Sequence, residues 1–141
     1  MLLNVSYNES EVKEKIEAAV GKPFTLRERW SMSGVGSPKL VISSTSIEIR
    51  NLLILDNNRN TCNIELRPKG IILRFRSLLE TYALIVPYYK LNLYKGKAEE
   101  YSIYKDQQFI KILVNNKGVQ KFFSKLKAEK TKKQNPSIED L

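Results

Sequence analysis

The stretch from residue 69 to residue 89, KGIILRFRSLLETYALIVPYY, is the most hydrophobic part of the chain and constrains its fold most strongly. A transmembrane helix needs about 20 mostly apolar residues. Here Arg74, Arg76 and Glu80 interrupt the run. Charged side chains at such positions are costly inside a bilayer. The sequence therefore argues against a membrane span.

The same stretch has the period of a β-strand. Ile71, Leu73 and Phe75 alternate with two arginines, and the second half is rich in residues that favour strands. This pattern argues against a single buried helix. We predict two antiparallel strands that are joined through residues 77–80.

Two other regions also have strand character. Residues 41–55 are predicted to form a strand that bends into the interior, because Ile47 and Ile49 alternate with charged residues before an apolar run. Residues 62–67 alternate cleanly and predict a half-buried strand. Residues 89–100 are predicted to be irregular or briefly helical.

A second hairpin is predicted over residues 101–114, with its turn at residues 106–108. Ile110, Ile112 and Val114 then share one face of the second strand and are expected to point inward. The predicted elements in this part of the chain are therefore strands paired with their neighbours.

Helical spacing appears only near the two ends. Residues 8–23 predict a short helix, with Asn8 as its cap and Gly21 at its end. A C-terminal helix is predicted up to about Glu129, and the rest of the chain is expected to be frayed. Four apolar residues form the buried stripe of this second helix: Val119, Phe122, Phe123 and Leu126.

A chain of 141 residues is long enough for one hydrophobic core. We predict an N-terminal helix with a connecting extension over residues 1–40, a central domain over residues 41–129, and a flexible lysine-rich tail over residues 130–141. The hydrophobic fraction of 42% and the charged fraction of 28% are ordinary for a folded protein.

Antiparallel hairpins followed by one amphipathic helix, together with the segment NIELRPKGIILRFRSLLETYALIVPYYKL, resemble the bacterial pleckstrin-homology-like (PH-like) domains of the GRAM type. The resemblance covers residues 45–129. It implies a mainly β (α+β) fold, in which a C-terminal amphipathic helix closes a barrel of antiparallel hairpins. Such domains bind phosphoinositides, peptides or other proteins, and the fold alone does not choose among them.

Two features depart from the phosphoinositide-binding members of that family. Their first hairpin loop carries several basic residues, whereas the matching residues 56–61 include one arginine and one aspartate. Classical members often have a tryptophan in the closing helix, but the only tryptophan here is Trp30. The resemblance therefore gives little support for specific recognition of inositol lipids.

The net charge of +9 favours acidic partners. Residues 115–135 contain seven lysines and one glutamate, so much of the excess lies near the C-terminus. Our leading hypothesis is a non-enzymatic binding or adaptor module that recognises a protein segment or an anionic membrane surface. A peptide added along an exposed strand edge is the simplest mechanism. The sequence leaves the oligomeric state open.

The alternative is a basic nucleic-acid-binding protein that uses the tyrosine- and lysine-rich region 88–105. Six of the seven tyrosines lie between Tyr82 and Tyr104, interleaved with lysines. Tyrosine faces can stack on bases while lysines bind phosphates, although tyrosine is also common in ordinary strands. The candidate ligand-binding residues are Arg74, Arg76, Tyr88, Tyr89, Lys90, Lys95 and Lys97.

The sequence offers no catalytic, metal or cofactor site. Histidine is absent, Cys62 is the only cysteine, and the three aspartates, Asp56, Asp106 and Asp140, show no pairing pattern. A small enzyme is therefore the third hypothesis. The lone cysteine and a start without a signal-peptide pattern favour the cytoplasm, with peripheral attachment to the inner face of the membrane as a further possibility.

Overall fold

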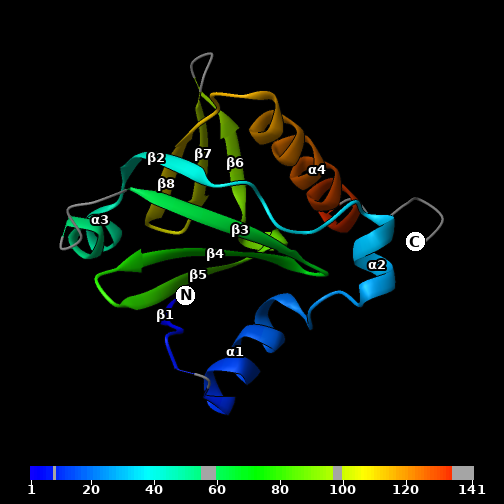
Figure 1. Cartoon of the computed structure of the whole chain (residues 1–141), viewed down its shortest axis with the longest axis horizontal. Coiled ribbons are helices and arrows are strands. Elements are labelled where there is room, and N and C mark those ends of the chain that lie inside the picture. The colour runs from blue at the N-terminus through cyan, green and yellow to red at the C-terminus, as the bar shows by residue number, and fades with distance from the viewer. Residues whose placement is uncertain (8, 55–59, 97–99, 135–141) are drawn as a thin grey trace.

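The computed structural model describes residues 1–7, 9–54, 60–96 and 100–134, whose strands form one eight-stranded antiparallel sheet (Figure 1). The elements in chain order are β1 (Leu2–Asn4), α1 (Ser10–Val20), α2 (Leu26–Ser31), β2 (Leu40–Thr45), α3 (Ile47–Ile54), β3 (Thr61–Arg67), β4 (Gly70–Ser77), β5 (Glu80–Pro87), the 3-10 turn η1 (Tyr88–Lys90), β6 (Asn92–Lys95), β7 (Glu100–Lys105), β8 (Gln108–Leu113) and α4 (Lys117–Gln134). Their order across the sheet is β1-β5-β4-β3-β2-β8-β7-β6.

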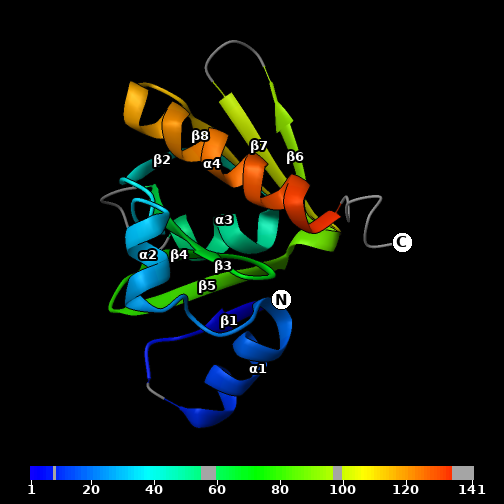
Figure 2. The ribbon, with the colours of Figure 1, turned by 90° about the vertical axis from the view of Figure 1, so that its right-hand side faces the viewer.

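Strand β2 belongs to both halves of this sheet. It pairs with β3 at Leu40 and Val41, and with β8 up to Thr45. Helix α4 lies across the space between the two halves (Figures 1 and 2). Within the described residues, the edge strands β1 and β6 do not pair with each other. The structure is mainly β with a C-terminal helix, as predicted, but the predicted barrel is wrong because the sheet is open.

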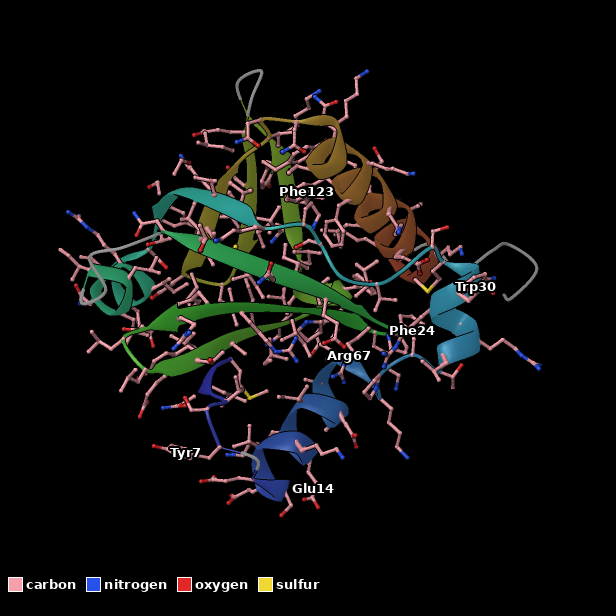
Figure 3. The ribbon with its side chains drawn as sticks, viewed as in Figure 1. Tyr7, Glu14, Phe24, Trp30, Arg67 and Phe123 are labelled. Carbon is pink, nitrogen blue, oxygen red and sulfur yellow. The ribbon has the colours of Figure 1, made fainter. Side chains whose placement is uncertain are left out.

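The main core lies between the two halves of the sheet and α4. Phe123 is fully buried and stacks on Tyr101, with 4.4 Å between the ring centroids. Figure 3 shows Phe123 between α4 and the strands. The predicted stripe of α4 is confirmed, since each of its members is at most 4% exposed: Val119, Phe122, Phe123 and Leu126.

A second, smaller core lies on the other face of the sheet. There α1 packs Ile16 and Val20 against Ile72, Ala83 and Ile85 of β4 and β5. Figure 2 shows α1 and α4 on opposite sides of these strands. The N-terminal segment is thus joined to the sheet, because β1 pairs with β5 and α1 packs on the face of β4 and β5. Asn8, the predicted helix cap, lies outside the described residues, and Glu9 takes the N-cap position.

Both predicted hairpins are confirmed. Strands β4 and β5 pair along their whole length, from Gly70 with Pro87 to Ser77 with Glu80. Leu78, in the turn between them, has a φ of 57°, a conformation uncommon for leucine. The hairpin of β7 and β8 buries the predicted inward residues, Ile110, Ile112 and Val114. In the described part of the chain, no helix has the length and apolar character needed to cross a membrane.

The strand predicted over residues 41–55 is wrong after Thr45 as far as Ile54, and Leu55 lies outside the described residues. Residues Ile47–Ile54 form α3, because Ile49 and Leu53 are four residues apart and both are buried on one helical face. The alternation around Ile47 is too short to outweigh this packing. The hydroxyl of Ser46 accepts a hydrogen bond from the N–H of Phe109 and so fixes the point where β2 ends.

Two other boundaries also differ from the prediction. The segment predicted to be irregular contains β6, in which Leu93 is partly buried against the main core. Helix α4 continues past the predicted end at Glu129 to Gln134. An ion pair between Glu129 and Lys132 spans this last part of the helix, and good helix formers around it favour continuation. The remainder of the predicted tail, 135–141, lies outside the described residues.

Substitution of Gly70 should destabilise the protein. A Cβ at this position would lie 2.4 Å from the carbonyl oxygen of Val86 and 2.6 Å from the Val20 side chain. We expect Gly70→Ala to lower the free energy of unfolding by about 1–3 kcal/mol, measured by urea denaturation. Gly36→Ala is the matched control, because a Cβ there meets no atom within 4 Å. Equal stability of the two variants would contradict the close packing of Val20 of α1 against Gly70 of β4.

The thiol of Cys62 should be unreactive in the folded protein. The side chain is 2% exposed, and burial raises its pKa to about 12 from an ordinary value of 9.0. We expect slow reaction with a thiol reagent at about pH 8 and fast reaction in urea. Because only the unfolded state ionises between these two pKa values, stability should fall as the pH rises from 9.0 towards 12. In Cys62→Ala, this loss of stability at alkaline pH should be smaller.

Candidate functional site

The structure does not bring all the predicted ligand-binding residues together. Arg74 and Arg76 lie on β4, whereas Tyr89, Lys90 and Lys95 lie on or next to β6. Four strands separate β4 from β6 in the sheet, namely β3, β2, β8 and β7. Lys97 lies outside the described residues. The candidate site must therefore be built around one of the two regions.

Arg74 belongs to an ion-pair network on the outer face of the sheet. Its Nη1 donates to Glu65 Oε1 at 2.8 Å, and Arg67 Nε donates to Glu65 Oε2 at 2.5 Å. Arg67 Nη1 also donates to the carbonyl oxygen of Gly21 at the end of α1. Burial alone would raise the pKa of Glu65, but the hydrogen bonds and charges of Arg74 and Arg67 hold that pKa below its ordinary value. This network fastens α1 to the sheet.

Two adjacent tyrosines of η1 have opposite environments. Tyr88 is 2% exposed, and its hydroxyl donates to the carbonyl oxygen of Arg67 at 3.3 Å. Burial, with a smaller effect of the Glu129 charge, raises the pKa of Tyr88. This burial leaves the Tyr88 side chain little surface for contact with a ligand. Tyr89 is 75% exposed, and the Nζ of Lys90 lies 5.9 Å from its ring centroid. Tyr89 and Lys90 remain at the surface beside β6.

Strand β6 forms one edge of the sheet, with β7 as its neighbour among the described residues. The N–H of Gly96 donates to the carbonyl oxygen of Glu100, which faces it across the pair. In an antiparallel pair, alternate residues direct their N–H and C=O groups towards the partner strand. Counting back from Gly96, the main-chain groups of Leu93 and Lys95 point away from β7. They form a short row of outward donors and acceptors.

Aromatic side chains cover the outer face of the strands behind this edge. Tyr94 is 59% exposed, and its ring centroid lies 5.5 Å from that of Tyr104 on β7. The Tyr104 ring lies 5.7 Å from Phe109 on β8. The Nζ of Lys111 is 5.9 Å from the Phe109 centroid. We call Tyr94, Tyr104 and Phe109 the aromatic row.

The residues that the sequence offered for metal binding or catalysis are Cys62 and three aspartates. Within that part of the chain, no three acidic, cysteine or histidine side chains are grouped as metal ligands. Cys62 is buried in the core. Asp106 lies in the β7–β8 turn with a φ of 54°, a role for which aspartate is well suited. Asp56 and Asp140 lie outside the described residues.

The prediction missed the strand edge itself and the partners of Tyr94. Leu91 and Leu93 alternate with Asn92 and Tyr94 in the sequence, which is the strand signal that marks β6. The sequence does not show that the residues of the aromatic row lie side by side, because they come from three strands and only the pairing of those strands brings them together.

Comparison with protein-family models, curated proteins and solved structures gave no match.

Proposed function

We propose that the protein is a non-enzymatic binding module that takes up an extended, acidic protein segment along the edge of β6. The outward main-chain groups of Leu93 and Lys95 carry this proposal, because they can extend the sheet by one strand. Strand addition draws its affinity from main-chain hydrogen bonds. It therefore needs no special residues in the protein beyond a free edge.

The charge around the edge favours acidic partners. Lys90 and Lys95 are exposed at the two ends of this segment, and the whole chain carries a net charge of +9. Complementary charge speeds association and disfavours basic segments. The exposed rings of Tyr89 and Tyr94 add apolar contact area beside the main-chain groups.

A PH-like fold is part of this proposal. Its support is the arrangement of the sheet, in which β2 is shared by two halves and α4 packs over the space between them. This arrangement shares with the resemblance over residues 45–129 its antiparallel hairpins and its C-terminal helix, although the sheet is open. The segment from β1 to α2 would then be an addition to that fold.

Removal of one outward N–H should weaken peptide binding. In Lys95→Pro, the main chain loses the N–H that points away from β7, while proline is tolerated at such an edge position. Peptides that bind the wild-type protein are first selected from a displayed random library. We expect these peptides to bind Lys95→Pro about tenfold more weakly than the wild-type protein, measured by calorimetry.

Lys95→Ala is the matched control, since it removes the same side chain and keeps the N–H. We expect about twofold weaker binding for this variant, in line with the small contribution of an exposed charge. Two results would contradict strand addition at β6: failure of the library to yield any binding peptide, or equal affinities of Lys95→Pro and Lys95→Ala.

The aromatic row favours a second candidate function, the binding of single-stranded nucleic acid. Its three rings lie on one exposed sheet face, with Lys111 beside Phe109. Stacking of bases on such rings is largely independent of sequence. Lys111, which lies on the same face as Phe109, would then contact a phosphate.

This second function predicts that Tyr94→Ala weakens the binding of a fluorescent single-stranded oligonucleotide by about tenfold, because one stacking partner is lost. Binding should also weaken steeply as salt is raised. Fluorescence anisotropy measures both effects. Tyr89→Ala is the control, since its ring is exposed but lies outside the aromatic row. Absence of binding at low salt would exclude this function.

A further inference from the structure

Helix α2 exposes two large apolar side chains. Trp30 is 89% exposed and Leu26 is 81% exposed. They are four residues apart and therefore lie on the same side of the helix. Figure 3 shows Trp30 on α2 at the periphery of the molecule. None of the residues of α2 is buried, so this pair adds little to the stability of the fold.

The ends of α2 are firmly held although its middle is exposed. Thr25 and Glu28 form a capping box at the start of the helix. After its end, the N–H of Gly34 donates to the carbonyl oxygen of Arg29 at 2.8 Å. The flanking residues Phe24 and Met32 pack against the main core. The helix therefore presents Leu26 and Trp30 in a fixed orientation.

Basic side chains surround the exposed pair. Arg27 and Arg29 lie on α2 itself and are exposed. From α4, the Nζ of Lys125 donates to the carbonyl oxygens of Ser33 and Gly34 at 3.4 Å and 3.1 Å. Lys121 lies one turn before Lys125 on α4 and is also exposed.

The acidic group nearest in sequence to the pair is engaged locally. The Glu28 carboxylate reaches back to the N–H of Thr25 at 3.0 Å, at the start of the helix. Glu28 keeps its negative charge there, but the cations of Arg27, Arg29, Lys121 and Lys125 outnumber it, so the net charge of this surface is positive.

We propose that α2 is a docking surface for an anionic lipid bilayer, in which Trp30 and Leu26 enter the interface and the surrounding arginines and lysines bind the headgroups. Tryptophan prefers the membrane interface because its ring is apolar and its N–H is polar. Basic residues next to an apolar anchor supply the second signal that stable membrane attachment needs. This proposal is independent of peptide binding at β6.

The size of the surface favours a bilayer over a protein partner. A stable protein interface takes about 20–30 residues from each side, whereas α2 has six residues. Two inserted side chains with several cations around them are enough for reversible attachment to an anionic membrane. A lipid surface supplies both the negative charge and the apolar interior that this patch requires.

Trp30 is the only tryptophan, so its fluorescence reports directly on the proposed contact. The full chain is mixed with vesicles of phosphatidylcholine alone, or of phosphatidylcholine with phosphatidylglycerol in equal parts. With the anionic vesicles, we expect the protein to float with the lipid, the emission to shift to shorter wavelength, and brominated lipids to quench it. With neutral vesicles we expect at least tenfold weaker binding.

Leu26→Ala and Trp30→Ala should each reduce binding to the anionic vesicles by about tenfold in a flotation assay, because apolar area is lost from the interface. Leu79→Ala is the matched control. It removes a leucine that is 88% exposed in the β4–β5 turn, far from α2 in sequence, and should leave binding unchanged. Both substituted residues of α2 are exposed, so urea denaturation should show unaltered stability.

Three results would overturn the proposal. The first is failure of the wild-type protein to float with anionic vesicles. The second is flotation without a change in Trp30 emission, which would mean that the lysines of α4 adsorb to the surface without α2. The third is an equal loss of binding in Leu79→Ala, which would move the contact to the β4–β5 turn.

Discussion

The two halves of the sheet depend on the pairing of β2. The strand meets β3 over only two residue pairs, at Leu40 and Val41, before it turns towards β8 with an irregularity between Ile42 and Ser44. This change of direction creates the space that α4 fills. The stacked rings of Phe123 and Tyr101 then hold α4 to the second half. A continuous pairing of β2 with β3 would leave α4 without a concave surface to cover.

Local patterns predicted the elements whose partners are close in sequence. The β4–β5 and β7–β8 hairpins alternate cleanly, so neighbouring residues decide both. Asp106 suits the β7–β8 turn, whereas Leu78 is an uncommon residue at its positive φ, so alternation and not turn chemistry predicts the β4–β5 hairpin. The end of β2 could not be predicted in the same way. Around Ile49, strand and helix spacings coexist, and burial of Leu53 against distant strands decides in favour of the helix. Such burial depends on contacts that no short window of sequence contains.

The candidate site shows the same limit. Tyr88 and Tyr89 are identical neighbours in the sequence, yet one is 2% exposed and the other 75% exposed. Which of them reaches solvent is set by the packing of η1 against α4. Sequence composition identified a region rich in tyrosine and lysine, and the sheet register determined which of these side chains share a face. Arg74, in contrast, is drawn into a network that holds α1 in place.

Lys125 links surfaces that lie far apart in sequence. It binds the turn after α2, and α4, which carries it, also contacts η1, the segment that leads into β6. One stiff helix therefore connects the Trp30 surface with the strand edge. If α2 rests on a bilayer, the height and direction of β6 above the lipid are set by the fold. A segment bound there would leave the protein along a defined path, whatever its own sequence.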